Sequence, residues 1–199
     1  MDNAALQHLA PHLYLERQFN LRAAKILPGE YYVTSQEMVL VTVLGSCVAA
    51  CVRDPLHKIG GMNHFMLPEH GGDPDSPLSV SARYGAYAME ILINHLLQMG
   101  ANRGRLEAKV FGAGQVLAGA TDVGIRNTAF VLHYLERERI RLVAQDLGGT
   151  HARKVYYFPD SGRVLVRDLR QHSDSLLNQE RDYGRTIDSM PVAGDAELF

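Results

Sequence analysis

The chain has 199 residues, of which 46% are hydrophobic, and a formal net charge of -2. This length and composition allow one domain with a sizeable core, and the near-neutral charge argues against general nucleic-acid binding. No run of about 18 apolar residues is present, which excludes a transmembrane helix by length. No secretory signal is recognisable at the N-terminus, and there are only two cysteines, so a reducing, cytoplasmic location is expected.

The chain divides into three parts by its periodic patterns. Residues 1–23 are irregular in pattern and are interpreted as an N-terminal extension. Residues 24–169 carry nearly all the strong periodic signals and are predicted to form one domain. Residues 170–199 are polar and weakly patterned, and we expect a partly disordered tail there.

Within the central part, strands outnumber helices. Apolar or alternating runs predict strands over residues 37–45, 47–54, 58–68, 105–114 and 141–149, followed by a hairpin over 153–169 with its turn at Pro-Asp-Ser-Gly. Helical spacing predicts a helix over 79–100, preceded by serines and capped by Gly100, and a shorter one over 127–140 with Asn127 as N-cap. Hairpins mixed with crossovers indicate a mixed α/β domain.

Both cysteines lie in one short stretch, Cys47 and Cys51, four residues apart. The surrounding valines and alanines favour a strand, in which these positions lie roughly 13 Å apart. A disulfide needs Cα atoms within about 7 Å of each other, so the pair is not expected to be crosslinked. No further cysteines or close histidine pair accompany them, so a zinc site is not expected either.

The two cysteines differ in their local sequence. Cys51 lies in the middle of a predicted strand, where a buried, inert thiol is the usual outcome. Cys47 follows Leu-Gly-Ser at the end of a buried strand, and Gly45 would permit a sharp turn whose amides face a developing oxyanion. The local sequence leaves a buried hydrophobe and a nucleophile equally open for Cys47.

A thiol nucleophile needs a base, which is usually a histidine. Of the nine histidines, two are candidates: His64 on the strand after the Cys47 strand, and His151 in a glycine loop. Met62 and Met66 would share the face of His64 and shield it from water. A core histidine bonded to a backbone carbonyl is the alternative interpretation of His64, and spacing alone does not decide between them.

The segment from Val41 to Pro68 resembles the signature of the chemoreceptor glutamine deamidases, the CheD family. This signature contains Gly-Ser-Cys and Gly-Met-Asn-His, and His64 follows Cys47 at a spacing of seventeen. The likeness extends over roughly residues 24–169. One small departure is Phe-Gly-Ala-Gly at residues 111–114, where the family usually has Phe-Gly-Gly-Ala.

The resemblance implies roles for individual residues. Cys47 would be the nucleophile and His64 the general base, with a partly ionised thiol near neutral pH. The third catalytic residue of the family is a threonine on the preceding strand, for which Thr42 is the available residue, although the register would favour Val41. Amides of the turn at Gly45 and Ser46 would stabilise the oxyanion. No metal or organic cofactor is implied.

The implied fold is a single domain with two mixed β-sheets in a sandwich flanked by helices, similar to the catalytic domain of cytotoxic necrotising factors. The implied substrates are glutamines in the cytoplasmic helices of methyl-accepting chemotaxis receptors, and a CheC-type phosphatase is an expected partner in some organisms. A non-catalytic adaptor, a thiol redox switch and a thiol peptidase are the alternatives. An intact Cys47 and His64 argue against an adaptor.

Overall fold

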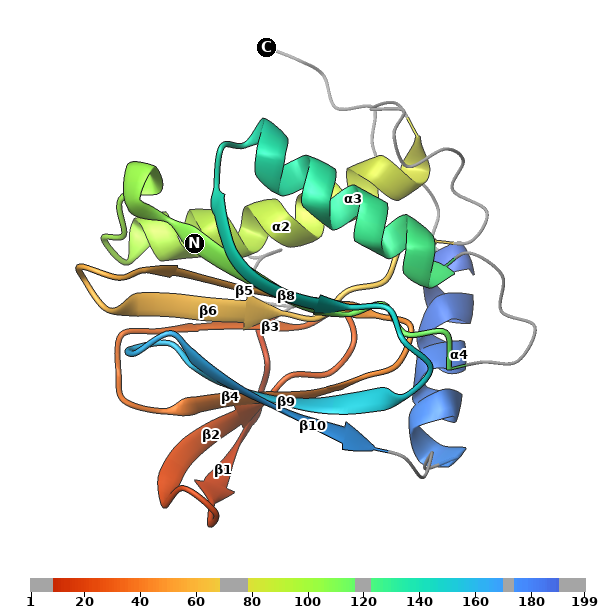
Figure 1. The fold of residues 1–199 in the computed structure, drawn as a ribbon, viewed down its shortest axis with the longest axis horizontal. Helices are drawn as coiled ribbons and strands as arrows, with labels where there is room; N and C mark the ends of the chain where they lie inside the picture. The colour runs from red at the N-terminus through yellow and green to blue at the C-terminus, as the bar shows by residue number, and fades with distance from the viewer. Residues whose placement is uncertain (1–8, 69–78, 117–122, 170–173, 190–199) are drawn as a thin grey trace.

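The structure is a computed structural model, and it describes residues 9–68, 79–116, 123–169 and 174–189. Two five-stranded sheets face each other (Figure 1). The first sheet has the order β1-β2-β4-β9-β10, with the bounds β1 His12–Glu16, β2 Leu21–Lys25, β4 Val39–Leu44, β9 Ala152–Phe158 and β10 Arg163–Leu169. The second sheet has the order β3-β6-β5-β7-β8, with the bounds β3 Tyr31–Thr34, β6 Ile59–Asn63, β5 Val48–Asp54, β7 Glu107–Gly112 and β8 Arg141–Leu147.

Both sheets are mixed. Within the first, β2 and β4 are parallel and the other pairs are antiparallel, whereas in the second only β7 and β8 are parallel. Helices α2 (Val80–Gln98) and α3 (Val123–Arg137) cover the outer face of the second sheet (Figure 1). The predicted α/β sandwich is therefore confirmed.

The period-two alternation of the strands builds two apolar layers. On β5, Val48, Ala50 and Val52 pack against the helices, while Ala49 and Cys51 face the first sheet. On β4, Leu40 and Leu44 face the second sheet, while Val39 and Val41 pack on the opposite face. Thr42 therefore lies on the inner face of β4, between the two sheets.

Several predicted element ends agree with the structure. The side chain of Ser79 caps α2 by accepting a hydrogen bond from the Ala82 amide, and Gly100 follows the helix with a φ of 102°. The hairpin of β9 and β10 turns where Pro159 to Gly162 were expected to turn. Asn127 is different: α3 begins at Val123, so Asn127 lies inside the helix and is buried, and the predicted N-cap is wrong.

The two ends of the chain are more structured than expected. β1 and β2 form an antiparallel hairpin, and β2 pairs with β4, so the expected boundary at residue 23 falls inside a strand of the sheet. After Leu169 the structure has helix α4, Asp174–Ser189, where a disordered tail was expected. Residues 1–8, 170–173 and 190–199 of these two segments lie outside the described residues. Figure 1 shows α4 beside the ends of both sheets.

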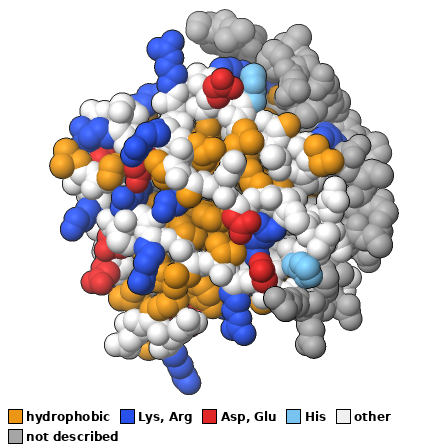
Figure 2. Space-filling model, in the orientation of Figure 1, with side chains coloured by type: hydrophobic (Ala, Val, Ile, Leu, Met, Phe, Trp, Pro, Cys, Tyr) orange, Lys and Arg blue, Asp and Glu red, His pale blue; other side chains and the backbone are white. Residues whose placement is uncertain are grey.

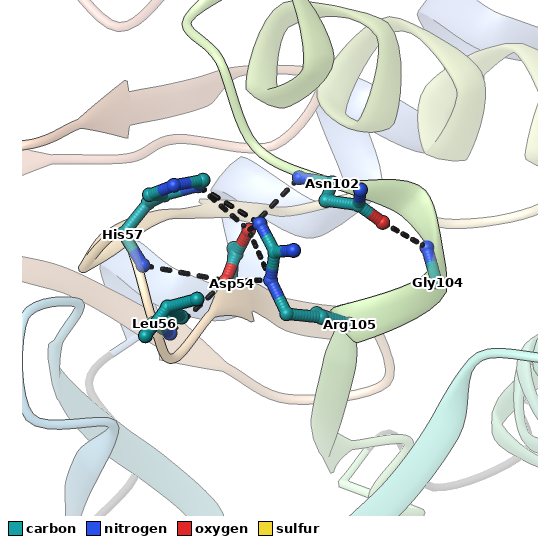
Figure 3. A network of polar contacts seen from close by, with 6 residues as sticks. All are labelled: Asp54, Leu56, His57, Asn102, Gly104 and Arg105. Atoms are coloured by element: carbon teal, nitrogen blue, oxygen red, sulfur yellow. Dashed lines mark hydrogen bonds and ion pairs between the residues drawn. The ribbon is translucent and has the colours of Figure 1, made fainter.

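A buried carboxylate fixes the far end of β5. Asp54 is fully buried and accepts hydrogen bonds from the amides of Leu56 (3.0 Å) and Asn102 (2.8 Å) and from the guanidinium of Arg105 (2.8 Å) (Figure 3). The hydrogen bond from Arg105 is the main cause of a pKa of Asp54 well below the ordinary range. This cluster ties the β5–β6 turn to the segment after α2.

The face that carries β8 and β10 is partly apolar. Figure 2 shows hydrophobic side chains gathered over the middle of this face. Leu142 and Val143 of β8 and Leu165 and Val166 of β10 are each more than a third exposed. Within the described residues, no helix is both long and apolar enough to cross a membrane.

Candidate active site

The turn at residues 45–47 connects the two sheets. β4 ends at Leu44 in the first sheet, and β5 begins at Val48 in the second. Backbone amides from the segment after β7 hold the turn: Ala113 donates to the Cys47 carbonyl and Gly114 to the Gly45 carbonyl, each at 2.7 Å. Cys47 therefore sits where the chain crosses between layers, at the end of the sandwich.

Asn127 holds the same turn from α3. Its side-chain amide donates to the Ser46 carbonyl at 2.9 Å, and its oxygen accepts from the Leu67 amide at 2.9 Å. These bonds link the turn to the segment that follows His64. A polar residue at the start of a helical pattern suggested only a cap, so this positioning contact could not be found from the sequence.

A glycine at position 45 leaves room for the carboxylate of Glu180 beside the turn. Its φ is not positive, contrary to the expectation of an unusual backbone dihedral. A Cβ at Gly45 would lie 2.6 Å from a carboxylate oxygen of Glu180, well inside contact distance. Glycine at this position therefore keeps the amides of the turn open to an approaching oxygen.

Cys47 and Cys51 occupy separate environments. Both thiols are free and buried, and Cys51 lies on β5 opposite Met62 of β6 and Lys109 of β7. Burial, and after it the Glu180 carboxylate, raises the pKa of the Cys47 thiol. The expectation of a partly ionised thiol is therefore not met in this arrangement, because the thiol is fully buried and a carboxylate that the sequence did not reveal lies beside it.

His64 is placed next to this turn by β6, which ends at Asn63. The backbone of His64 donates to the Glu30 carbonyl at 2.9 Å and accepts from the Gly29 amide at 2.7 Å. One ring nitrogen of His64, Sγ of Cys47 and an oxygen of Glu180 all lie within 4.8 Å of one another. The structure thus brings together Cys47 and His64, as the sequence suggested.

Thr42 lies behind the imidazole. Its hydroxyl oxygen is 2.8 Å from Nδ1 of His64 and 2.7 Å from the carbonyl oxygen of Ile26. Val41 packs on the opposite face of β4. Of the two residues considered for the third position, Thr42 is the one that contacts His64.

These distances fix the tautomer of His64. The Ile26 carbonyl only accepts, so the single hydroxyl proton of Thr42 goes to it, and Nδ1 of His64 must donate to the hydroxyl oxygen. Nε2 then carries the lone pair, and it is buried without a hydrogen-bond partner. Burial lowers the pKa of His64 to about 4, although the Glu180 charge and the Ile26 carbonyl oppose the shift. The ring is therefore neutral, with a free basic nitrogen.

The carboxylate of Glu180 on α4 accepts hydrogen bonds from the backbone amides of the turn at residues 45–47. This carboxylate accepts from the Gly45 amide at 2.7 Å, the Ser46 amide at 3.0 Å, the Ser46 hydroxyl at 2.9 Å and the Cys47 amide at 3.4 Å. Glu180 is 1% exposed. Donors of this kind, converging on one point in a buried site, match an oxyanion hole. Nothing in the sequence pattern of residues 170–199 pointed to this residue.

Cys47, His64 and Glu180 also have the side chains of a metal site. The carboxylate of Glu180, however, is already bonded to three amides and a hydroxyl. A cation would compete with those donors for the same oxygens, whereas an oxyanion would be stabilised by them. The donor set therefore fits an anion better than a metal ion.

His151, the other candidate base, lies before β9 and is exposed. The contact recorded for its ring is with the adjacent Thr150, 3.3 Å from the hydroxyl to Nδ1. In contrast, the ring of His64 lies in the buried cluster with Cys47. The geometry favours His64 as the partner of the thiol.

Among solved structures, a Neisseria meningitidis protein described by the DUF152 family model is similar over 68% of this chain and 67% of its own. The identity is 12% and the TM-score 0.43.

Comparison with known sequences is more informative. The family model described as CheD chemotactic sensory transduction matches residues 66–168. A protein of Janthinobacterium sp. (strain Marseille) is 57% identical over 202 residues, which cover 100% of both chains. A protein of Dechloromonas aromatica (strain RCB) is 58% identical with the same coverage. These relatives are named "Probable chemoreceptor glutamine deamidase CheD" and "Probable chemoreceptor glutamine deamidase CheD 1". The chain belongs to the CheD family.

Proposed function

We propose that this protein is a protein-glutamine deamidase that converts glutamine side chains of methyl-accepting chemotaxis receptors to glutamate and releases ammonia. The observation that carries the proposal is the unpartnered Nε2 of a neutral His64 in the same buried cluster as the Cys47 thiol. The names of the relatives support the substrate class.

Each group has a definite part in the proposed reaction. Nε2 of His64 takes the thiol proton as Sγ of Cys47 attacks the side-chain carbonyl carbon of the glutamine. The amides of Gly45, Ser46 and Cys47 stabilise the oxyanion that forms. The protonated His64 then gives its proton to the departing ammonia, which leaves a thioester on Cys47.

Water completes the cycle. His64, again neutral, accepts a proton from a water molecule that attacks the thioester, and glutamate and the free thiol are formed. Thr42 holds Nδ1 of His64 and passes no proton itself, because its hydroxyl is bonded to the Ile26 carbonyl. Every step uses protein groups and water alone. Binding to a CheC-type phosphatase stays a further expectation from the family.

The test is intact-mass analysis of a receptor cytoplasmic fragment incubated with the protein. Each converted site increases the mass by about one unit, because an amide NH2 is replaced by OH. Cys47→Ser should abolish the increase, and His64→Ala should reduce its rate by at least about a hundredfold. A fragment cleaved at peptide bonds would support a thiol peptidase instead, and binding without any mass change would support an adaptor.

A further inference from the structure

One face of α4 makes the contacts with the domain. Glu180, Tyr183, Gly184 and Ile187 follow the spacing i, i+3, i+4 and i+7, which places them on a single side of a helix. Glu180 and Ile187 are buried, and Ile187 joins the apolar core between the sheets. Residues on the other side, such as Asp182, are exposed.

The domain has a surface shaped to receive this face. A Cβ at Gly29 would lie 2.9 Å from the ring of Tyr183, and one at Gly45 would lie 2.6 Å from the carboxylate of Glu180. The hydroxyl of Tyr183 is bonded to that of Tyr84 on α2. The absence of side chains at Gly29 and Gly45 thus lets a helix approach closely.

Glu180 has the chemical form of the reaction product. It is a glutamate side chain on a helix, its carboxylate is held by the amides of the turn, and an oxygen of that carboxylate lies within 4.8 Å of Sγ of Cys47. A product glutamate released from the thioester would have the same groups in the same place.

With α4 in this position, the reacting groups are out of reach. Cys47 is 0% exposed and His64 is 1% exposed. A receptor glutamine reaches Cys47 only after Glu180 has left the amides. Because α4 belongs to the same chain, it competes at an effective concentration on the order of millimolar.

We infer, on the basis of the function proposed above, that α4 is a tethered ligand of the active site, in which Glu180 occupies the place of the product carboxylate. The site is closed by α4 and opens to a receptor helix that presents a glutamine and displaces it.

A chemical consequence makes the inference testable. If residue 180 were glutamine, its amide carbon would lie where a substrate carbon lies. Sγ of Cys47 would give its proton to Nε2 of His64 and form a bond to that carbon, the C–N bond would break, and ammonia would leave with the proton that His64 took from the thiol. Water would then break the C–S bond and leave glutamate at position 180.

The experiment is peptide mass spectrometry of purified full-length Glu180→Gln. Conversion of residue 180 to glutamate, or a thioester between residues 47 and 180, is the expected result. The double variant Glu180→Gln, Cys47→Ala should show neither. Asp182→Gln is the matched control, because it places a glutamine on the exposed side of the same helix, where no conversion is expected. Fragment ions separate residue 180 from the neighbouring Gln179.

The receptor fragment distinguishes the two proposals. If residue 180 stays glutamine while the same protein deamidates the fragment, the inference about α4 is wrong and the proposed function stands. If neither reaction occurs, the proposed function fails, and the inference that depends on it fails too.

A second variant separates inhibition from structural support. Glu180→Ala removes the carboxylate that competes with substrate, so the KM for the receptor fragment should fall about tenfold with little change in kcat. If Glu180 instead served only to hold the turn in shape, kcat would fall and KM would not improve.

Discussion

Removal of the Thr42 hydroxyl should impair His64 as the base and leave the Cys47 thiol unchanged. Thr42→Val keeps the size of the side chain and takes away the oxygen that lies 2.8 Å from Nδ1 of His64. The Ile26 carbonyl, 2.7 Å away in the native protein, loses its donor at the same time. Both groups lie in the buried layer between the sheets, where a lost partner is not replaced by solvent.

The magnitude follows from these two bonds. A buried polar group left without a partner costs about 1–3 kcal/mol, so the free energy of unfolding should fall by roughly 2 kcal/mol or more. The bond to Thr42 also selects the tautomer with Nε2 free. A net hydrogen-bond contribution of about 1 kcal/mol corresponds to about a fivefold change in the ratio of the two tautomers, so kcat should fall by up to about fivefold.

Two measurements test this expectation. Urea unfolding gives the change in stability, and intact-mass kinetics on a receptor fragment at saturating concentration gives kcat. Thr42→Ser is the control, because it keeps the hydroxyl and removes only the methyl group, and it should retain most of kcat. A folded Thr42→Val with wild-type kcat would show that Thr42 does not orient His64, and the assignment of Nε2 as the base would then lose its support.

Four further changes test other parts of the structure. Cys51→Ser should keep most of the activity that Cys47→Ser abolishes, as measured on the receptor fragment; equal loss in two folded variants would point to a paired-thiol function. Gly112→Ala should cost more than about 2 kcal/mol in urea unfolding, because its Cβ would lie 2.2 Å from the Cys47 carbonyl oxygen at a φ of 109°. Folding lowers the pKa of Asp54, so its ionised carboxylate stabilises the fold fully above the unfolded pKa of about 3.9, and this contribution is lost as the pH falls below that value. In urea unfolding, Asp54→Asn should be less stable than the wild type at pH 7, and its free energy of unfolding should fall less on acidification. Glu180→Ala should raise the rate of iodoacetamide alkylation of Cys47, and an unchanged rate would mean that α4 does not shield the thiol.

The sequence was informative wherever a local pattern decides the outcome. The β-branched run before Gly45, the helical spacing after Ser79 and the Pro-Asp-Ser-Gly turn each specify an element through its own residues, and each element is present. The pairing of the β5 and β6 strands also placed His64 near Cys47, because two strands joined by a short turn lie side by side. These parts needed no long-range information.

The parts that could not be predicted depend on contacts between distant segments. Residues 174–189 are polar overall, and the face that packs on the domain carries a buried glutamate, Glu180, in addition to Tyr183 and Ile187. A buried glutamate is unexpected from composition, because burial of a charge is costly unless several donors surround it. Those donors are the amides of residues 45–47, more than 130 positions away. Asn127 was misinterpreted for the same reason, since its partners Ser46 and Leu67 are distant in sequence.

The missed helix and the incorrect expectation for the thiol have one physical origin. A turn whose amides converge on one point in a buried site stabilises a transient oxyanion, but it leaves those N–H groups without partners when the site is empty. Glu180 supplies the partners, and burial of the thiol, followed by the charge of Glu180, raises the pKa of Cys47. A carboxylate satisfies the Ser46 amide and hydroxyl with one oxygen, whereas an amide NH2 in that position would face the Ser46 N–H as a second donor. The site therefore favours a product-like glutamate over a substrate glutamine in the resting state. Displacement of α4 removes the negative charge beside the thiol and the cover over it in a single step, so ionisation of Cys47 and access of the substrate are coupled.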